Sequence, residues 1–142
     1  MKDEYDQLKL DNQLCFPLYA AARKVVALYT PLLKPLGLTY TQYIILMVLW
    51  EKGKTTIKEL GEKLHLDTGT LTPVLKRMEA DGHVTRQRSS SDERVVNVRI
   101  TDKGMSLREK AKDVPNQIGA CVPLSEKDAR ELYRLLYLVI EA

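Results

Sequence analysis

The sequence predicts a mainly α-helical fold with a small β-hairpin, and three observations support this. Thr, Ser or Asp residues precede stretches whose apolar residues recur every three to four positions, as in amphipathic helices. Two short segments rich in β-branched residues are joined by a polar turn. Both terminal stretches are too apolar for the surface helices of a lone small domain. The 142 residues match the size of one domain with a real core.

The first predicted helix begins at Asp11 and continues to Pro31 and Pro35, which end or bend it. Pro17 is tolerated only near the start of a helix, so Cys15 is expected in or just before the first turn. There the backbone amides and the positive end of the helix favour a thiolate.

A second apolar helix is expected after a cap at Thr39 or Thr41, and Gly53 closes it. Residues 56–59, Thr-Ile-Lys-Glu, fit a capping box and therefore open a short third helix. Residues 65–66 break the apolar pattern of this third helix.

Asp67 carries a short acceptor side chain that can cap the next helix, which Gly82 ends. Two short helices with a tight turn form a helix-turn-helix, whose second helix enters the DNA major groove by its N-terminal residues. Small hydroxyl side chains there can hydrogen-bond base edges or phosphates, although any one of them can equally be only a cap. The candidate DNA-contacting residues in this helix are Thr68, Thr70, Thr72, Pro73, Lys76 and Arg77.

Residues 84–88 and 95–100 read as two strands joined by a polar segment, and a hairpin directly after a helix-turn-helix is a wing. Asp92 lies two residues before Arg94 and can hold its guanidinium by a charge-assisted bond. An exposed hairpin with arginines can be a merely solvated surface, but its position after the two helices favours DNA contact. The candidate contacts in the wing are Arg86, Arg88, Ser89, Ser90, Asp92 and Arg94.

After the wing, Thr101 is expected to cap a charged helix that meets Pro115. Residues 116–123 hold Cys121 in a loop, and Ser125 opens a last amphipathic helix.

The chain is therefore divided into a winged helix-turn-helix at residues 39–104 and terminal helices at residues 1–36 and 105–142. The terminal helices are predicted to pair across a two-fold axis, which sets two recognition helices one DNA turn, about 34 Å, apart. The alternative is that they wrap the core of the same chain.

The composition of the chain excludes some classes of protein but does not by itself indicate a function. The net charge of +3 and the pI near 8.8 are only mildly basic and would not alone indicate nucleic acid. No 18-residue apolar run or signal peptide is present, so a cytoplasmic protein without membrane contact is expected. The two histidines are isolated and no Cys-x-x-Cys pair occurs, so we expect no metal, no cofactor and no enzymatic activity.

Three tyrosines are candidates for stabilising a thiolate at Cys15 by donating hydrogen bonds from their phenols. Tyr19 is one turn further along the predicted helix and on the same face. Tyr29 is fourteen residues away, about 21 Å along a helix, so any contact with Cys15 must come from a partner chain packed antiparallel. Tyr40 lies at the start of the next helix. The alternative reading is that Cys15 is only a small buried apolar residue.

Residues 67–73, Asp-Thr-Gly-Thr-Leu-Thr-Pro, with residues 76–79, 92–94 and 98–104, resemble the winged-helix core of the multiple antibiotic resistance regulator (MarR) family. This resemblance implies a homodimeric transcriptional regulator, usually a repressor. It implies binding to a pseudo-palindromic operator and release of the operator when an inducer arrives.

Residues 10–16, together with Tyr29, Tyr40 and their neighbours, resemble the organic hydroperoxide resistance regulator (OhrR) branch of that family. The resemblance implies that Cys15 reacts with peroxide and is held by Tyr29 and Tyr40 of the other subunit. One subgroup traps the sulfenic acid with a small thiol, and another has a second cysteine near the last helix. Cys121 resembles this second cysteine.

The sequence thus predicts a repressor that is released when organic hydroperoxide oxidises Cys15, which then forms a disulfide with Cys121, expected to be that of the partner. Two alternatives remain. One is a MarR-type repressor released by a small aromatic or phenolic ligand, with Cys15 structural. The other is a thiol peroxidase, which the absence of a second catalytic constellation disfavours.

Overall fold

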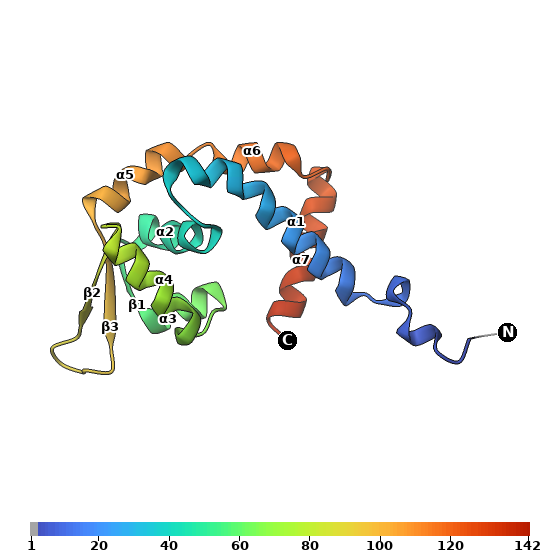
Figure 1. Ribbon diagram of the computed structural model, residues 1–142, viewed down its shortest axis with the longest axis horizontal. Coiled ribbons are helices and arrows are strands. Elements are labelled where there is room, and N and C mark those ends of the chain that lie inside the picture. Colours follow the sequence, from blue (N-terminus) through green and yellow to red (C-terminus); the bar gives the residue numbers. More distant parts are fainter. Residues whose placement is uncertain (1–2) are drawn as a thin grey trace.

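The computed structural model describes residues 3–142 and confirms a mainly helical chain with a small sheet (Figure 1). The elements are α1 (Cys15–Leu33), α2 (Tyr40–Lys52), β1 (Lys54–Thr56), α3 (Ile57–Leu64), α4 (Thr68–Ala80), β2 (Val84–Arg88), β3 (Val96–Ile100), α5 (Asp102–Ala111), α6 (Val114–Cys121) and α7 (Glu126–Ile140). Short 3₁₀ turns occupy Asp6–Leu8, Leu10–Asn12 and Lys34–Leu36.

Side-chain caps fix the starts of α2, α3, α4, α5 and α7, as the sequence predicted. Of the two candidate threonines before α2, Thr39 is the cap, and it forms a full capping box with Gln42. Thr56 and Glu59 form the same box at α3. The side chains of Asp67, Thr101 and Ser125 cap α4, α5 and α7. Each cap stabilises its helix by about 1 kcal/mol.

Helix α2 is the centre of the winged lobe, by which we mean α2 to α5 with the sheet. Ile45, Leu46 and Leu49 of α2 are completely buried. The other fully buried side chains of the lobe are Leu60, Leu71, Leu75, Met78, Val84 and Val98. Trp50 donates its Nε1–H to the carbonyl oxygen of Gly104 at 3.0 Å and ties α2 to the start of α5. This shared core fixes α3, α4 and the sheet relative to one another.

The sheet has three antiparallel strands in the order β1-β3-β2, whereas the sequence predicted only the β2-β3 hairpin. The missed strand β1 is three residues long, and Thr55 at its centre pairs with Val98 far along the chain. Both residues are buried, because this face of the sheet packs against the helices. The additional strand makes β3 the central strand, and β2, with its arginines, is one edge of the sheet.

Helices α1 and α7 extend away from the winged lobe (Figure 1). Leu33 is the only buried residue of α1, and α7 has none within the part of the chain that is described. The exposed apolar side chains are Phe16, Leu18, Tyr19, Val25 and Val26 in α1 and Leu132, Tyr133, Leu135, Tyr137, Leu138, Val139 and Ile140 in α7. Apolar helix faces of this size mark an interaction surface.

Two predicted boundaries are wrong. Helix α1 begins at Cys15 rather than at Asp11, because a 3₁₀ turn at Leu10–Asn12 and an extended Gln13 precede it. The segment before the last helix is not a loop, since α6 runs to Cys121. Pro115 lies in the first turn of this helix instead of ending the preceding one, because proline needs no amide partner in a first turn.

Within residues 3–142, no single helix is long and apolar enough to cross a membrane. Residues 15–36 and 40–52 reach that length and composition only as a pair bent by 71°.

Candidate functional site

Helices α3 and α4 form a tight helix-turn-helix. A Cβ at Gly61 would lie 2.6 Å from the carbonyl oxygen of Leu66, so glycine permits this close crossing. His65 has a φ of 55°, a left-handed conformation that reverses the chain. Asp67 then accepts the N–H of Thr70 at 2.6 Å and starts α4. Bonds from the hydroxyl and then the amide of Thr70 lower the pKa of Asp67, so this cap is ionised at neutral pH.

The first turns of α4 present the residues predicted to contact DNA. Thr68, Thr70, Pro73, Lys76 and Arg77 are exposed. The hydroxyl of Thr72 donates to the carbonyl oxygen of Thr68 at 2.8 Å, which leaves the Thr72 oxygen and methyl group for outside contacts. Arg77 Nε lies 3.3 Å from Asp81 Oδ2, near the C-terminal end of the helix. Small side chains therefore come first on α4, and cations follow one turn later.

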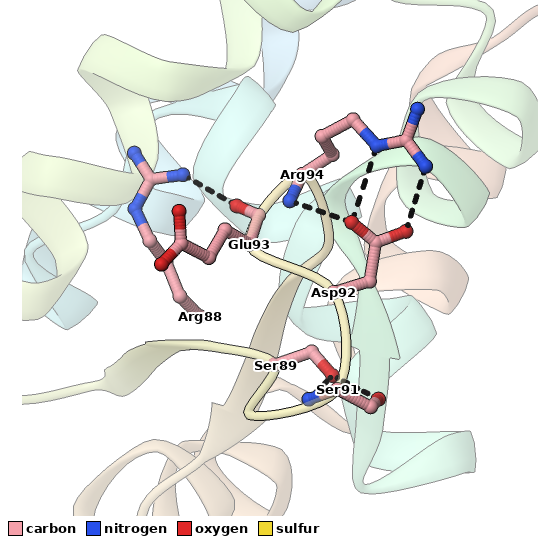
Figure 2. A network of polar contacts seen from close by, with 6 residues as sticks. All are labelled: Arg88, Ser89, Ser91, Asp92, Glu93 and Arg94. Carbon is pink, nitrogen blue, oxygen red and sulfur yellow. Dashed lines mark hydrogen bonds and ion pairs between the residues drawn. The ribbon is translucent and has the colours of Figure 1, made fainter.

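The turn of the wing holds Arg94 in a fixed direction (Figure 2). Asp92 Oδ1 accepts the backbone N–H and the Nε–H of Arg94 at 3.0 and 3.2 Å, and Asp92 Oδ2 accepts from Nη2 at 3.3 Å. The guanidinium and then the amide of Arg94 lower the pKa of Asp92. The Arg94 side chain is still 91% exposed. An oriented, exposed guanidinium at a hairpin tip suits insertion into a narrow minor groove.

The same turn is braced by its first strand. Arg88 Nη1 donates to the carbonyl oxygen of Glu93 at 2.8 Å (Figure 2). The N–H of Ser89 donates to the carbonyl oxygen of Val95 at 2.8 Å. Ser90 is exposed at the turn. The wing tip is therefore ordered by its own contacts and does not need DNA to shape it.

Arg86 lies differently from the other predicted wing residues. Its side chain is only 21% exposed, and its Nη2 donates to Glu79 Oε1 of α4 at 3.2 Å. Its backbone N–H donates to Glu79 Oε2 at 3.0 Å. The backbone N–H and then the guanidinium of Arg86 lower the pKa of Glu79. This contact fixes the wing relative to the recognition helix.

A hollow of about 540 Å³ lies between α4 and the wing. It is lined by Ile57, Thr68, Thr72, Lys76, Arg86, Gln87, Arg88, Arg94 and Val96. Among the described residues, this lining contains cations and no carboxylate, so the hollow is complementary to a phosphodiester backbone. Thr70, Pro73, Arg77, Ser89, Ser90 and Asp92 lie outside the lining. Gln87, a polar residue between two arginines on the edge strand, was not predicted from the sequence.

The candidate thiol site begins at Cys15, the first residue of α1, whose side chain is exposed. Tyr29 and Tyr40 lie together elsewhere, with their ring centroids 4.8 Å apart, and they line a hollow of about 690 Å³. Cys15 and Tyr29 stand at opposite parts of one helix, about 21 Å apart. One chain therefore does not bring the predicted cysteine and tyrosines together.

The tyrosine cluster includes a third residue, Tyr43, that was not predicted from the sequence. The ring centroid of Tyr43 lies 5.7 Å from that of Tyr29. Burial and then the neighbouring Tyr40 raise the pKa of Tyr29, so this phenol stays protonated and can donate a hydrogen bond at neutral pH. Tyr19 is outside the cluster, with the guanidinium carbon of Arg23 5.6 Å from its ring centroid.

Cys121 is exposed at the last position of α6, and both cysteines are free thiols. Helix α6 packs against α1, and its buried residues Val114 and Ile118 belong to the core. The second thiol is thus anchored close to the helix that carries the first.

A helix-turn-helix with a braced arginine wing and a cationic hollow between them defines a winged-helix DNA-binding protein. The family model described as transcriptional regulator SarA/Rot matches residues 27–111. The organic hydroperoxide resistance transcriptional regulator of Bacillus subtilis (strain 168) is 48% identical over 141 residues, which cover 99% of this chain and 96% of that relative. The chain therefore belongs to the MarR family of winged-helix transcriptional regulators, in its OhrR branch.

Solved structures agree with this assignment. Reduced AbfR bound to DNA is 34% identical with a TM-score of 0.80, and the match covers 98% of this chain and 97% of that one. Disulfide-formed AbfR is 37% identical with a TM-score of 0.67, and the match covers 96% of both chains. The protein is a DNA-binding transcriptional regulator.

Proposed function

We propose that this protein is a redox-sensing repressor, which binds a pseudo-palindromic operator as a reduced homodimer and releases it when an organic hydroperoxide oxidises Cys15. One observation carries the proposal. The exposed thiol of Cys15 is at the first position of α1, while Tyr29 and Tyr40, the phenols that could hydrogen-bond to its thiolate, lie about 21 Å away in the same chain. The names of the relatives support it, since one concerns organic hydroperoxide resistance and AbfR is known in reduced and disulfide forms.

A homodimer reconciles the separated parts of the thiol site. The exposed apolar faces of α1 and α7 need a partner, and a second copy of the chain offers the same faces. Residues 1–36 and 105–142 then form the dimerisation region, and residues 39–104 bind DNA. An antiparallel α1 pair brings Tyr29 and Tyr40 of one subunit toward Cys15 of the other. Tyr19 supports the thiolate from the same chain.

In the DNA complex, α4 enters the major groove and the wing reaches the minor groove. The major-groove contacts are Thr68, Thr70, Thr72 and Pro73, with Lys76 and Arg77 on phosphates. The wing contacts are Arg88, Ser89, Ser90 and Arg94, with Asp92 and Arg86 as positioning residues. A chain that works on operator DNA works in the cytoplasm. The cationic hollow supports these roles, because it joins both elements in one surface.

The chemistry is a two-electron oxidation of sulfur. The Cys15 thiolate attacks the terminal oxygen of the hydroperoxide, an S–O bond forms and the O–O bond breaks. The alkoxide takes a proton and leaves as an alcohol, and Cys15 becomes a sulfenic acid. Attack by the Cys121 thiol of the partner then forms a disulfide and releases water. The phenols of Tyr29 and Tyr40 would lose their acceptor when the thiolate is consumed.

Operator release follows from geometry. A disulfide between the start of α1 and the end of α6 requires these helix ends to approach, which shifts the winged lobes off the spacing of the DNA half-sites. A shift of about 2.7 kcal/mol between the two states changes operator affinity about 100-fold.

The test is a fluorescence anisotropy titration on a duplex selected from a random-sequence library with the reduced protein. Wild type is measured reduced, then after one equivalent of cumene hydroperoxide, then after dithiothreitol. We expect affinity to fall about 100-fold on oxidation and to return on reduction. A Cys15→Ser protein should stay bound throughout, and its release by peroxide would overturn the proposal.

The matched control is Cys121→Ser, which removes the second thiol and leaves the sensing one. If Cys121 resolves the sulfenic acid, mass spectrometry should find a subunit-linking disulfide in the oxidised wild type and an added oxygen in this variant. A mixed disulfide between Cys15 and an added small thiol in the oxidised wild type, in place of the subunit-linking disulfide, would assign the resolving role to that thiol instead.

One observation favours a second candidate function. The hollow beside Tyr29 and Tyr40 is also lined by Leu33 and Leu38, so it has the mixed apolar and phenolic character that suits a small aromatic ligand. A repressor of this kind would release DNA when salicylate is added to the Cys15→Ser protein. The redox proposal predicts no effect of salicylate on that variant.

A further inference from the structure

The outer face of the sheet carries two cations, Lys54 and Arg99, that do not line the hollow between α4 and the wing. Lys54 of β1 and Arg99 of β3 are paired directly across the sheet, and Thr85 of β2 completes the row. Both cations are exposed, and within residues 3–142 neither takes part in an ion pair. Like charges directly opposite each other destabilise a sheet, so an anion above this row would relieve the repulsion.

The surroundings of this row suit a phosphate group. A shallow hollow of about 180 Å³ over the row is lined by Lys54, Thr85, Gln87, Asn97 and Arg99. The residues that accompany the two cations are a hydroxyl and two amides, which can all donate hydrogen bonds. A neighbouring hollow adds Lys52 and a single carboxylate, that of Asp102. We call the five residues of the first hollow the outer wing face.

The outer wing face is continuous with the DNA-reading surface. Gln87 lines both the hollow beside α4 and the hollow on the outer face, so the two meet around the edge strand β2. Adjacent strands are about 4.8 Å apart, which places Lys54 about 10 Å from that edge, within the reach of neighbouring phosphates. The wing also lies at the end of the molecule away from the N-terminus and α7 (Figure 1).

From this placement we infer that the outer wing face binds the phosphodiester backbone of double-stranded DNA just outside each operator half-site. In the proposed dimer, joined through α1 and α7, the two wings would be outermost, because each lies at the end of its subunit away from α7, and their outer faces would lie toward the DNA that flanks the half-sites. The inference rests on the proposed DNA-bound dimer. The contact is independent of sequence, so it lengthens the footprint without changing the operator that is read.

The test uses two duplexes, the selected operator trimmed to its half-sites and the same operator with random flanks added at both ends. Anisotropy is measured with reduced wild type and with Lys54→Gln/Arg99→Gln over a range of salt concentrations. Wild type should bind the longer duplex about tenfold more tightly, and the double variant should lose this gain while binding the short duplex as wild type does. Four cations per dimer predict a log-log salt dependence steeper by about 3.6 on the long duplex.

Arg108→Gln/Lys110→Gln is the matched control, since it removes the same charge from exposed positions of α5, which lie outside the apolar faces of α1 and α7 that form the proposed dimer contact. This variant should keep the full gain from the flanks. Equal binding of both duplexes by wild type, or equal weakening of both in the Lys54→Gln/Arg99→Gln variant, would overturn the inference alone. Failure of reduced wild type to bind the short duplex would instead overturn the proposed function.

Discussion

At the scale of single residues, Gly104 permits the start of α5 to pack closely against the chain around His83, because glycine has no side chain. A Cβ there would lie 2.3 Å from the carbonyl oxygen of His83 and 2.9 Å from Ile100 Cγ1. Gly104→Ala should therefore lower the free energy of unfolding by about 1–3 kcal/mol, as measured by urea denaturation. Gly119→Ala is the control, because a Cβ at Gly119 in α6 meets no described atom within 4 Å. Equal destabilisation by both substitutions would contradict this account.

His83 gives the stability of the fold a dependence on pH. It is 6% exposed and its Nδ1 has no hydrogen-bond partner in the described structure. Burial and then Lys103 lower its pKa below 6.5, while Asp81 opposes the shift. The unfolded chain therefore binds more protons, so stability is complete above about pH 6.5 and falls as the pH drops toward the folded value.

The free energy of unfolding should therefore change with pH by at most about 1.4 kcal/mol per pH unit, the value for uptake of one proton. Urea unfolding between pH 7 and pH 5 should show this slope in wild type and lose it in His83→Gln. His65→Gln, at the other histidine, should retain it. Persistence of the slope in the His83 variant would assign it to another group.

At the scale of elements, the wing tip works as one unit because Asp92 orients Arg94. Arg94→Ala should weaken operator binding by about 1–3 kcal/mol, and Asp92→Ala by less, since the cation remains. The double variant should bind no worse than Arg94→Ala, so the two effects are not additive. Anisotropy on the selected operator measures all three. Additive losses would mean that Asp92 does not act through Arg94.

The elements that sequence predicted well are those fixed by local contacts. The caps at Thr56 and Asp67 lie within three residues of the amides they bind, so the pattern alone predicts α3 and α4. Strand β1 was missed because its pairing depends on distant β3. Helix α6 was missed because Pro115 reads as a stop when it serves as a start. The pairing of Arg86 with α4 likewise needs the tertiary fold.

At the scale of the whole molecule, the sequence suggests the members of the candidate thiol site, Cys15, Tyr29 and Tyr40, but the fold of one chain does not bring them together. The cysteine and the phenol pair are separated along α1 in the structure, as their sequence spacing requires. A second copy would complete this site and would also set the spacing of the recognition helices. One interface would thus control both peroxide sensing and operator binding, so its loss should abolish both.

Leu138 on α7 offers a direct test of that interface, because it is 62% exposed in one chain and is expected to be buried in the dimer. Leu138→Glu loses two apolar contacts across a two-fold axis, which should weaken the dimer by about 3–6 kcal/mol. Sedimentation velocity should then find monomers, and anisotropy should find operator affinity lost, while circular dichroism shows the winged lobe still folded. Lys127→Glu introduces the same side chain in the first turn of α7 and should stay dimeric. A dimeric Leu138→Glu protein would place the interface on another face and would leave the apolar side of α7 unexplained.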